Sequence, residues 1–197
     1  MRIAEYVLLF FGLVGLYIAV HVPGGPIPVL LVAAVAIVIY LRRHSVPLLG
    51  RVNGLKSVLM LWALVSVLTV GAVALFDREN LFILPRENPG LWLLICVFYP
   101  LTSVYPQELL YRGFLMHRYA PVFGDGKAMA AAGALAFGFA HLLFGNVIAV
   151  VATVIGGWLF ARRYQKTGSL LVVSIEHALY GITIFTVGLG QYFYHGA

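Results

Sequence analysis

The stretch Tyr105–Tyr119, YPQELLYRGFLMHRY, lies in the longest apolar run of the chain, about residues 90–118. Within 15 residues it holds one glutamate, two arginines and one histidine. An ionised group inside a bilayer is costly, from about 3 kcal/mol upward. If the run spans a membrane, these charges therefore need either a partner or a function.

The composition is that of an integral membrane protein. Hydrophobic residues make up 62% of the 197 residues and charged residues only 10%, far outside the range of soluble domains. The net charge is +6, from thirteen Lys and Arg against seven Asp and Glu. These basic residues lie between the apolar runs and form no single patch, so we expect no nucleic-acid binding. A single cysteine, Cys96, excludes an intramolecular disulfide.

Seven apolar runs approach the length of about 20 residues that a helix needs to cross a bilayer. The fourth is too long for one simple span and predicts either a long tilted helix or a helix broken near Pro100 or Pro106. The first carries Glu5 and lacks a clear small-residue cleavage site, so we interpret it as a retained span. The sequence predicts an all-α polytopic bundle of about seven transmembrane helices (six to eight), forming a single integral membrane domain over residues 1–197. The runs cover residues 3–20, 27–42, 57–76, 90–118, 128–144, 147–162 and 169–190.

The basic residues orient this bundle, because short cytoplasmic loops retain Lys and Arg. With a cytoplasmic N-terminus, ten basic residues fall inside and only Arg78 and Arg86 fall outside, with Arg112 set apart in an apolar run. An odd number of spans then places residues 191–197 on the opposite side from the N-terminus. The ten inner residues are Arg2, Arg42, Arg43, Arg51, Lys56, Arg118, Lys127, Arg162, Arg163 and Lys166.

Three ionisable residues of the apolar runs fall at similar depth. A rise of about 1.5 Å per residue puts Glu108, His141 and His177 roughly 15, 20 and 12 Å from the cytoplasmic ends of their helices. Arg112 follows Glu108 by four residues and shares its helical face, which favours an ion pair. Such a pair also suits catalysis, because an arginine orients a carboxylate and keeps it ionised. The sequence thus predicts a polar site within the membrane.

The order and spacing of these residues resemble the CAAX protease and bacteriocin-processing family of intramembrane proteases. That family has Glu-Glu-x-x-x-Arg on one helix, Phe-x-x-x-His on the next, and a later His commonly followed four residues on by Asn. Here the first motif is QELLYR at 107–112 and the second is FGFAH at 137–141. The third lies in GSLLVVSIEHALYG at 168–181. The resemblance covers about residues 90–190, which we take as the family-like core.

The resemblance implies an intramembrane endopeptidase of glutamate type that hydrolyses a peptide bond without a cofactor. Mapped onto this chain, Glu108 and His141 hold and activate the water, His177 donates to the oxyanion, and Arg112 positions the acid. The expected partners are the lipid bilayer and a membrane-associated peptide or protein substrate. A bacterial exported peptide or C-terminal sorting tag is favoured over a prenylated CAAX protein, with the bacterial inner membrane as the location. The sequence indicates no oligomeric state.

One departure from the family pattern concerns the base. Gln107 stands where the first Glu of the pair is expected, and an amide cannot accept a proton from water. Either Glu108 is the base, or the protein is a catalytically inactive relative that acts as a membrane scaffold or peptide-binding protein. Glu176, next to His177, either supplies the missing base or pairs with a polar group of a neighbouring helix.

A second departure concerns the oxyanion donor. Gly181 stands where the Asn is expected, so this donor is absent or is replaced by Tyr180, Asn146 or a backbone amide. A third hypothesis takes the acid and the two imidazoles as zinc ligands, because Glu and His side chains bind zinc. The prediction remains a protease without a metal.

Overall fold

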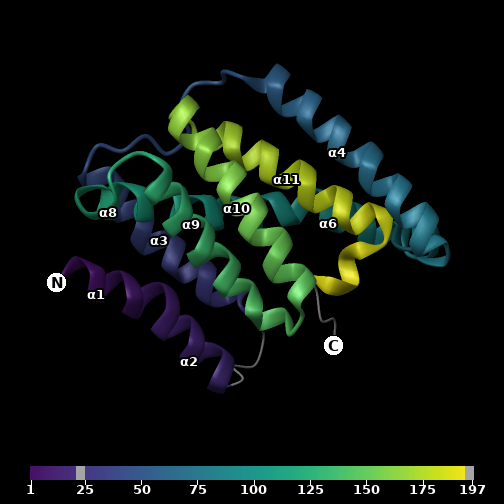
Figure 1. The fold of residues 1–197 in the computed structure, drawn as a ribbon, viewed down its shortest axis with the longest axis horizontal. Coiled ribbons are helices and arrows are strands. Elements are labelled where there is room, and N and C mark those ends of the chain that lie inside the picture. The colour runs from purple at the N-terminus through teal and green to yellow at the C-terminus, as the bar shows by residue number, and fades with distance from the viewer. Residues whose placement is uncertain (21–24, 194–197) are drawn as a thin grey trace.

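The computed structural model describes residues 1–20 and 25–193, which form a bundle of helices without strands (Figure 1). Six helical segments of this part of the chain are long and apolar enough to cross a membrane. A further helix, α3 (Ile27–Arg43), is slightly shorter at 17 residues and matches the remaining predicted run. The all-α polytopic bundle is confirmed, and residues 194–197 of the predicted outer C-terminus lie outside the described residues. The six segments are Arg2–Val20, Leu55–Phe76, Pro89–Phe123, Lys127–Phe144, Val147–Thr167 and Leu170–Val187.

The segment that carries Glu108 is one continuous helix of 35 residues, so it is long and not broken. At 1.5 Å per residue it measures about 50 Å, which exceeds a hydrocarbon core of about 30 Å and requires tilt or protrusion. It contains two π-helical turns, one beginning at Pro100 and one following α7, and such turns are common at functional sites. The successive parts are α6 (Pro89–Tyr99), η3 (Pro100–Val104), α7 (Tyr105–Glu108), η4 (Leu109–Phe114) and α8 (Leu115–Phe123).

The N-terminal helix packs along α8 and α9 (Lys127–Ala140). It consists of α1 (Arg2–Val7), the π-helical η1 (Leu8–Gly12) and α2 (Leu13–Val20). The Tyr6 hydroxyl donates to the Ala132 carbonyl at 2.9 Å. Glu5 accepts two hydrogen bonds from Arg118, at 2.9 and 2.8 Å. The carboxylate of the first predicted span is therefore paired at the end of the bundle.

Helices α9 and α10 (Val147–Thr167) form the closest antiparallel pair, as their short connection predicts. Gly138 permits this approach, because a Cβ there would overlap the Val154 side chain and lie 3.3 Å from the Val154 nitrogen. The connection is the short η5 (His141–Phe144), followed by Gly145 with φ of 67°. A small residue at this position thus allows the two helices to pack closely, as is common between membrane helices.

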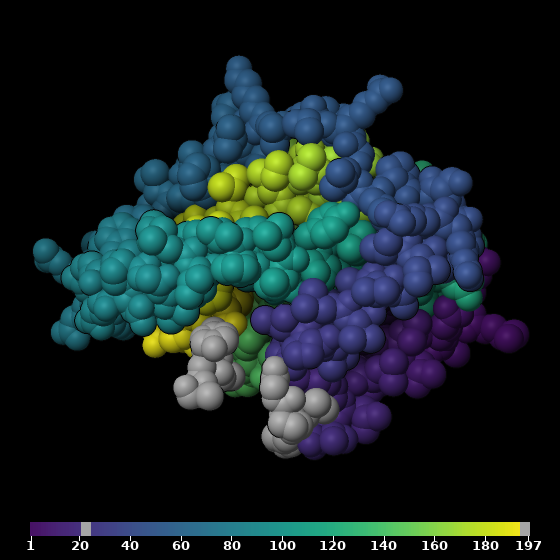
Figure 2. Space-filling model, turned by 180° about the vertical axis from the view of Figure 1, so that it is seen from behind, coloured from purple at the N-terminus to yellow at the C-terminus, as the bar shows by residue number. Residues whose placement is uncertain are grey.

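Helix α11 (Leu170–Val187) lies between α4 (Leu55–Phe76) and the long segment 89–123, as Figure 2 shows from behind. Polar side chains join these helices: the Trp62 indole donates to the Thr183 hydroxyl at 2.9 Å. Beyond α4, the short helices η2 (Arg78–Asn80) and α5 (Ile83–Glu87) fold back towards the end of α11. The short η6 (Leu189–Tyr192) follows α11.

The segments predicted to be cytoplasmic gather at one end of the bundle, at the upper left of Figure 1. The extended loop after α3 is fixed there, because the Leu49 carbonyl accepts from the Leu171 amide at 2.8 Å. The Gln165 amide likewise donates to the Gly126 carbonyl at 2.8 Å. This grouping agrees with alternating spans, and the cytoplasmic assignment of this end stays a prediction.

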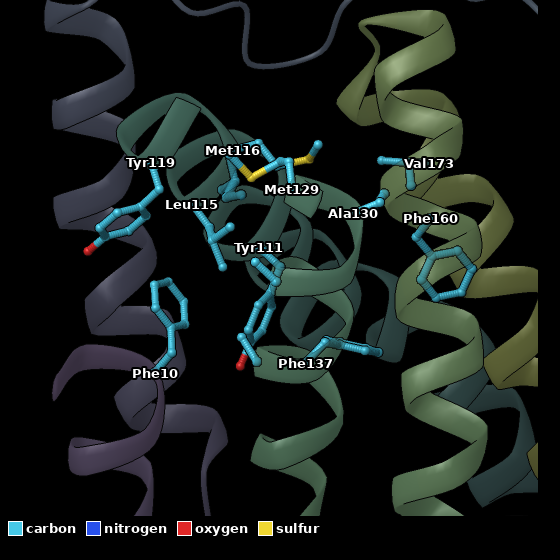
Figure 3. Packing of buried hydrophobic residues seen from close by; sticks show 14 of the residues in the cluster. Phe10, Tyr111, Leu115, Met116, Tyr119, Met129, Ala130, Phe137, Phe160 and Val173 are labelled. Carbon is cyan, nitrogen blue, oxygen red and sulfur yellow. The ribbon is translucent and has the colours of Figure 1, made fainter. Parts of the chain in front are cut away.

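Buried apolar side chains of α8, α9, α10 and the N-terminal helix meet in one cluster (Figure 3). Tyr111 lies in its middle, with its ring centroid 5.8 Å from that of Phe10 and 5.1 Å from that of Phe137. Phe137 and Phe160 carry the cluster onward to the polar residues of α7, η4 and α11. The core therefore forms one wall of the candidate site.

Candidate active site

The Glu108 carboxylate is the centre of the polar site. Its Oε1 lies 2.7 Å from Nδ1 of His177, and the two side chains are 0% and 8% exposed. An ionised carboxylate only accepts hydrogen bonds, so Nδ1 must carry the hydrogen. In the neutral imidazole, Nε2 is then the proton acceptor. Glu108 comes from the last turn of α7 and His177 from the middle of α11.

Arg112 is fully buried beside this pair. Its Nε lies 3.2 Å from Oε2 of Glu108, which confirms the ion pair predicted from the spacing. Its Nη2 donates to the Gly157 carbonyl at 3.0 Å, and the guanidinium lies 4.9 and 5.4 Å from the ring centres of Phe137 and Phe160. Pairing, hydrogen bonding and contact with aromatic faces together make a buried guanidinium tolerable.

The third predicted catalytic residue, His141, lies near this pair without touching it. Its Nδ1 donates to the Phe137 carbonyl at 2.7 Å, which leaves Nε2 as an acceptor in the neutral ring. The Phe137 ring neighbours both imidazoles, with ring centroids 4.6 Å from that of His141 and 5.5 Å from that of His177. His141 is also partly exposed. Joint activation of water by Glu108 and His141 therefore stays a prediction, while the imidazole in contact with Glu108 is that of His177.

Gln107 makes a local contact on its own helix. Its amide nitrogen donates to the Ser103 hydroxyl at 2.7 Å, one turn earlier on the same helix. The position at which the family motif has its first glutamate thus holds a neutral amide in a local contact.

Glu176 is engaged by a neighbouring helix. Its two oxygens accept from Nε and Nη2 of Arg163 at 2.8 and 2.9 Å. Arg163 also donates to the Ser57 hydroxyl of α4 at 2.7 Å. The structure gives Glu176 the pairing role, the second of the two alternatives that the sequence left open.

The two side chains suggested as substitute oxyanion donors have different surroundings. Asn146 caps α10: its Oδ1 accepts from the Ala149 amide at 2.8 Å, and its Nδ2 donates to the Tyr192 carbonyl at 2.8 Å. The Tyr180 hydroxyl is buried without a hydrogen-bond partner among the described residues. Neither residue has a hydrogen bond to Glu108 or His177 in that part of the chain.

Tyr99 is the polar residue of the site that the sequence analysis missed. Its hydroxyl lies 3.4 Å from Nε2 of His177. The phenol fills the space beside Gly181, where an added Cβ would come within 2.6 Å of its Cζ. The signal in the sequence was Gly181 itself, because a side chain missing from a motif leaves room for another group.

Within the described residues, no group of three His, Cys, Asp or Glu side chains is arranged so that it could hold a metal ion. The zinc hypothesis therefore stays a prediction, to be tested by metal analysis of the purified protein.

The fold and the site define a polytopic membrane protein with a buried acid–imidazole pair. Residues 88–183 match the family model described as Rce1-like, type II CAAX prenyl endopeptidase. This segment, which contains the acid and both histidines, is thus similar to the CAAX prenyl endopeptidases. The comparisons with curated proteins and with solved structures gave no match.

Proposed function

We propose that this protein is an intramembrane endopeptidase of glutamate type in which Glu108 acts through His177. The observation that carries the proposal is the 2.7 Å contact between these two buried side chains, inside the segment that matches a protease family. Glu108 holds the imidazole in one tautomer, and Arg112 holds Glu108. The site therefore has an oriented base although Gln107 carries no carboxylate.

Hydrolysis follows from this arrangement in two proton transfers. Water attacks the peptide carbonyl, its oxygen bonds to the carbonyl carbon, and its proton ends on Nε2 of His177. The resulting imidazolium is stabilised by the Glu108 carboxylate, which removes the cost of an isolated buried charge. The proton then passes to the amide nitrogen as the carbon–nitrogen bond breaks, so that a carboxylic acid and an amine leave. His141, which is partly exposed and whose Nε2 can accept a hydrogen bond, orients the water.

The proposed substrate is a peptide segment held at the membrane, because the reacting pair is buried among membrane-spanning helices. A bacterial exported peptide or a C-terminal sorting tag is favoured over a prenylated CAAX protein, and the bacterial inner membrane is the proposed location.

The test is cleavage of defined peptides by the full-length protein in liposomes, read by mass spectrometry of the products. The probes are a farnesylated CAAX peptide and unmodified peptides that carry a C-terminal membrane segment. We expect cleavage of at least one probe by the wild type and none by Glu108→Gln. Glu5→Gln is the matched control, because Glu5 is a partly exposed carboxylate at the end of the bundle. Equal cleavage by Glu108→Gln and wild type would refute the role of Glu108.

A second candidate function is peptide binding without cleavage, and the Gln107 contact with Ser103 favours it. On this hypothesis the wild type and Glu108→Gln retain the probes uncut, and Gln107→Glu restores cleavage. Cleavage by Gln107→Glu alone would identify the natural protein as a binding protein.

A further inference from the structure

We propose that Tyr99 is a catalytic residue, the hydroxyl through which the attacking water passes its proton to His177. The proposal rests on the proposed function and adds a third member to the Glu108–His177 pair. The result is a carboxylate, an imidazole and a hydroxyl in sequence, the arrangement by which a buried acid activates a group at the edge of a site.

Hydrogen-bond chemistry fixes which of Tyr99, His177 and Glu108 donates and which accepts. Glu108 accepts the hydrogen of Nδ1, so Nε2 of the neutral His177 ring accepts and the Tyr99 hydroxyl must donate. Arg112 already balances the charge of Glu108, and a further buried positive charge at rest would be costly. The phenol oxygen then has its lone pairs free to accept a hydrogen bond from water.

Position points to Tyr99 as the group that extends the buried pair towards the substrate. Glu108 is 0% exposed and His177 6% exposed, so neither meets a bulky substrate directly. Tyr99 is less enclosed than either of them, and its hydroxyl, although buried, lies against the only imidazole nitrogen that Glu108 leaves free. The distance of 3.4 Å is long for a strong hydrogen bond, and such contacts shorten when substrate closes the site.

Gly181 leaves the space that the Tyr99 phenol occupies. An added Cβ at Gly181 would overlap the Tyr99 ring, so any larger residue there requires the phenol to move from its present position beside His177. The Phe185 ring supports the phenol from the other side, with ring centroids 5.6 Å apart at 71°. Gly181 and Tyr99 thus act as a pair, the glycine giving space and the tyrosine giving the hydroxyl.

The transfer is balanced without any added reactant. The water O–H bond breaks as its proton moves to the Tyr99 oxygen, while the Tyr99 proton moves to Nε2 of His177. The water oxygen bonds to the carbonyl carbon, and Tyr99 ends as the neutral phenol. The reverse transfer delivers the proton to the leaving amine.

The test compares Tyr99→Phe with Tyr105→Phe in the full-length protein in liposomes, using the peptide probe that the wild type cuts best. Tyr105 is the matched control, because its hydroxyl donates to a backbone carbonyl, that of Leu48, at 2.8 Å. We expect Tyr99→Phe to lower kcat by at least about 100-fold with little change in KM, and Tyr105→Phe to stay within roughly threefold of wild type. Tyr99→Phe should also lower the solvent isotope effect on kcat, which a purely structural role would leave unchanged.

A second pair of variants tests whether the space beside Gly181 is needed. Gly181→Ala should lower kcat as Tyr99→Phe does, while Gly156→Ala should not, because a Cβ at Gly156 meets Phe160 only at 3.4 Å. Nitrogen NMR of labelled histidine gives a readout without substrate: the His177 Nε2 signal should shift in Tyr99→Phe and Gly181→Ala.

The outcomes separate the role of Tyr99 from the proposed function. Normal kcat in Tyr99→Phe, together with loss of cleavage in Glu108→Gln, would overturn the role of Tyr99 and leave the proposed function intact. A wild type that cuts no probe would overturn both catalytic proposals. In that case an unchanged His177 Nε2 signal in Tyr99→Phe would also show that the Tyr99–His177 contact does not form.

Discussion

Replacing Arg112 by methionine tests whether the site depends on a compensated buried charge. The guanidinium is fully buried, 3.2 Å from the Glu108 carboxylate and 3.0 Å from the Gly157 carbonyl. Methionine keeps much of the volume and removes the charge. Breaking a buried pair by removing one partner costs about 3–5 kcal/mol, because the remaining charge is left uncompensated. We expect the free energy of unfolding to fall by this amount.

The assay is a double-mutant cycle, with unfolding followed in mixed micelles. The partner substitution Glu108→Gln keeps the shape of the side chain and removes its charge. In Arg112→Met with Glu108→Gln no buried charge is left alone, so the double variant should recover about 2 kcal/mol relative to the sum of the single losses. Arg118→Met is the control, because its partner Glu5 is about one-third exposed and can be solvated. Strictly additive losses, or a loss below about 1 kcal/mol in Arg112→Met, would refute the reasoning.

Three further substitutions probe the structure around the site. Gly138→Val should lower the free energy of unfolding by about 1–3 kcal/mol, because the new side chain overlaps Val154 and overpacks the α9–α10 contact. The double variant Gly138→Val with Val154→Ala should recover part of this loss. A Gly138→Val protein as stable as the wild type would contradict the close packing. Asn146→Ala should cost about 1 kcal/mol through loss of the cap of α10, measured by thermal unfolding, and Asn146→Ser should recover most of it. Glu176→Gln should lower the free energy of unfolding by about 1–3 kcal/mol, because Arg163 loses its charged partner. Cleavage per folded molecule should stay unchanged. Loss of cleavage at normal stability would instead identify Glu176 as the base.

The sequence by itself determined the membrane class, the helices and the motif positions. Lipid cannot satisfy backbone polar groups, so long apolar runs must become helices, and their length fixes the spans. The ion pair of Glu108 with Arg112 also follows from the sequence, because residues four apart share a helical face. These features depend on local periodicity and on the solvent, which a single chain records directly.

The tertiary structure alone decided which polar groups touch. The sequence placed His141 with Glu108 at the water and His177 at the oxyanion. Depth along a helix does not give rotation about its axis, so only the packing of α11 shows that His177 is the imidazole in contact with Glu108. Spacing within one helix could not indicate Tyr99 either, because its hydroxyl reaches the site only where α6 passes beside Gly181. Contacts between helices depend on how distant segments pack, and this information lies in the three-dimensional arrangement of side chains and not in the spacing of any one motif.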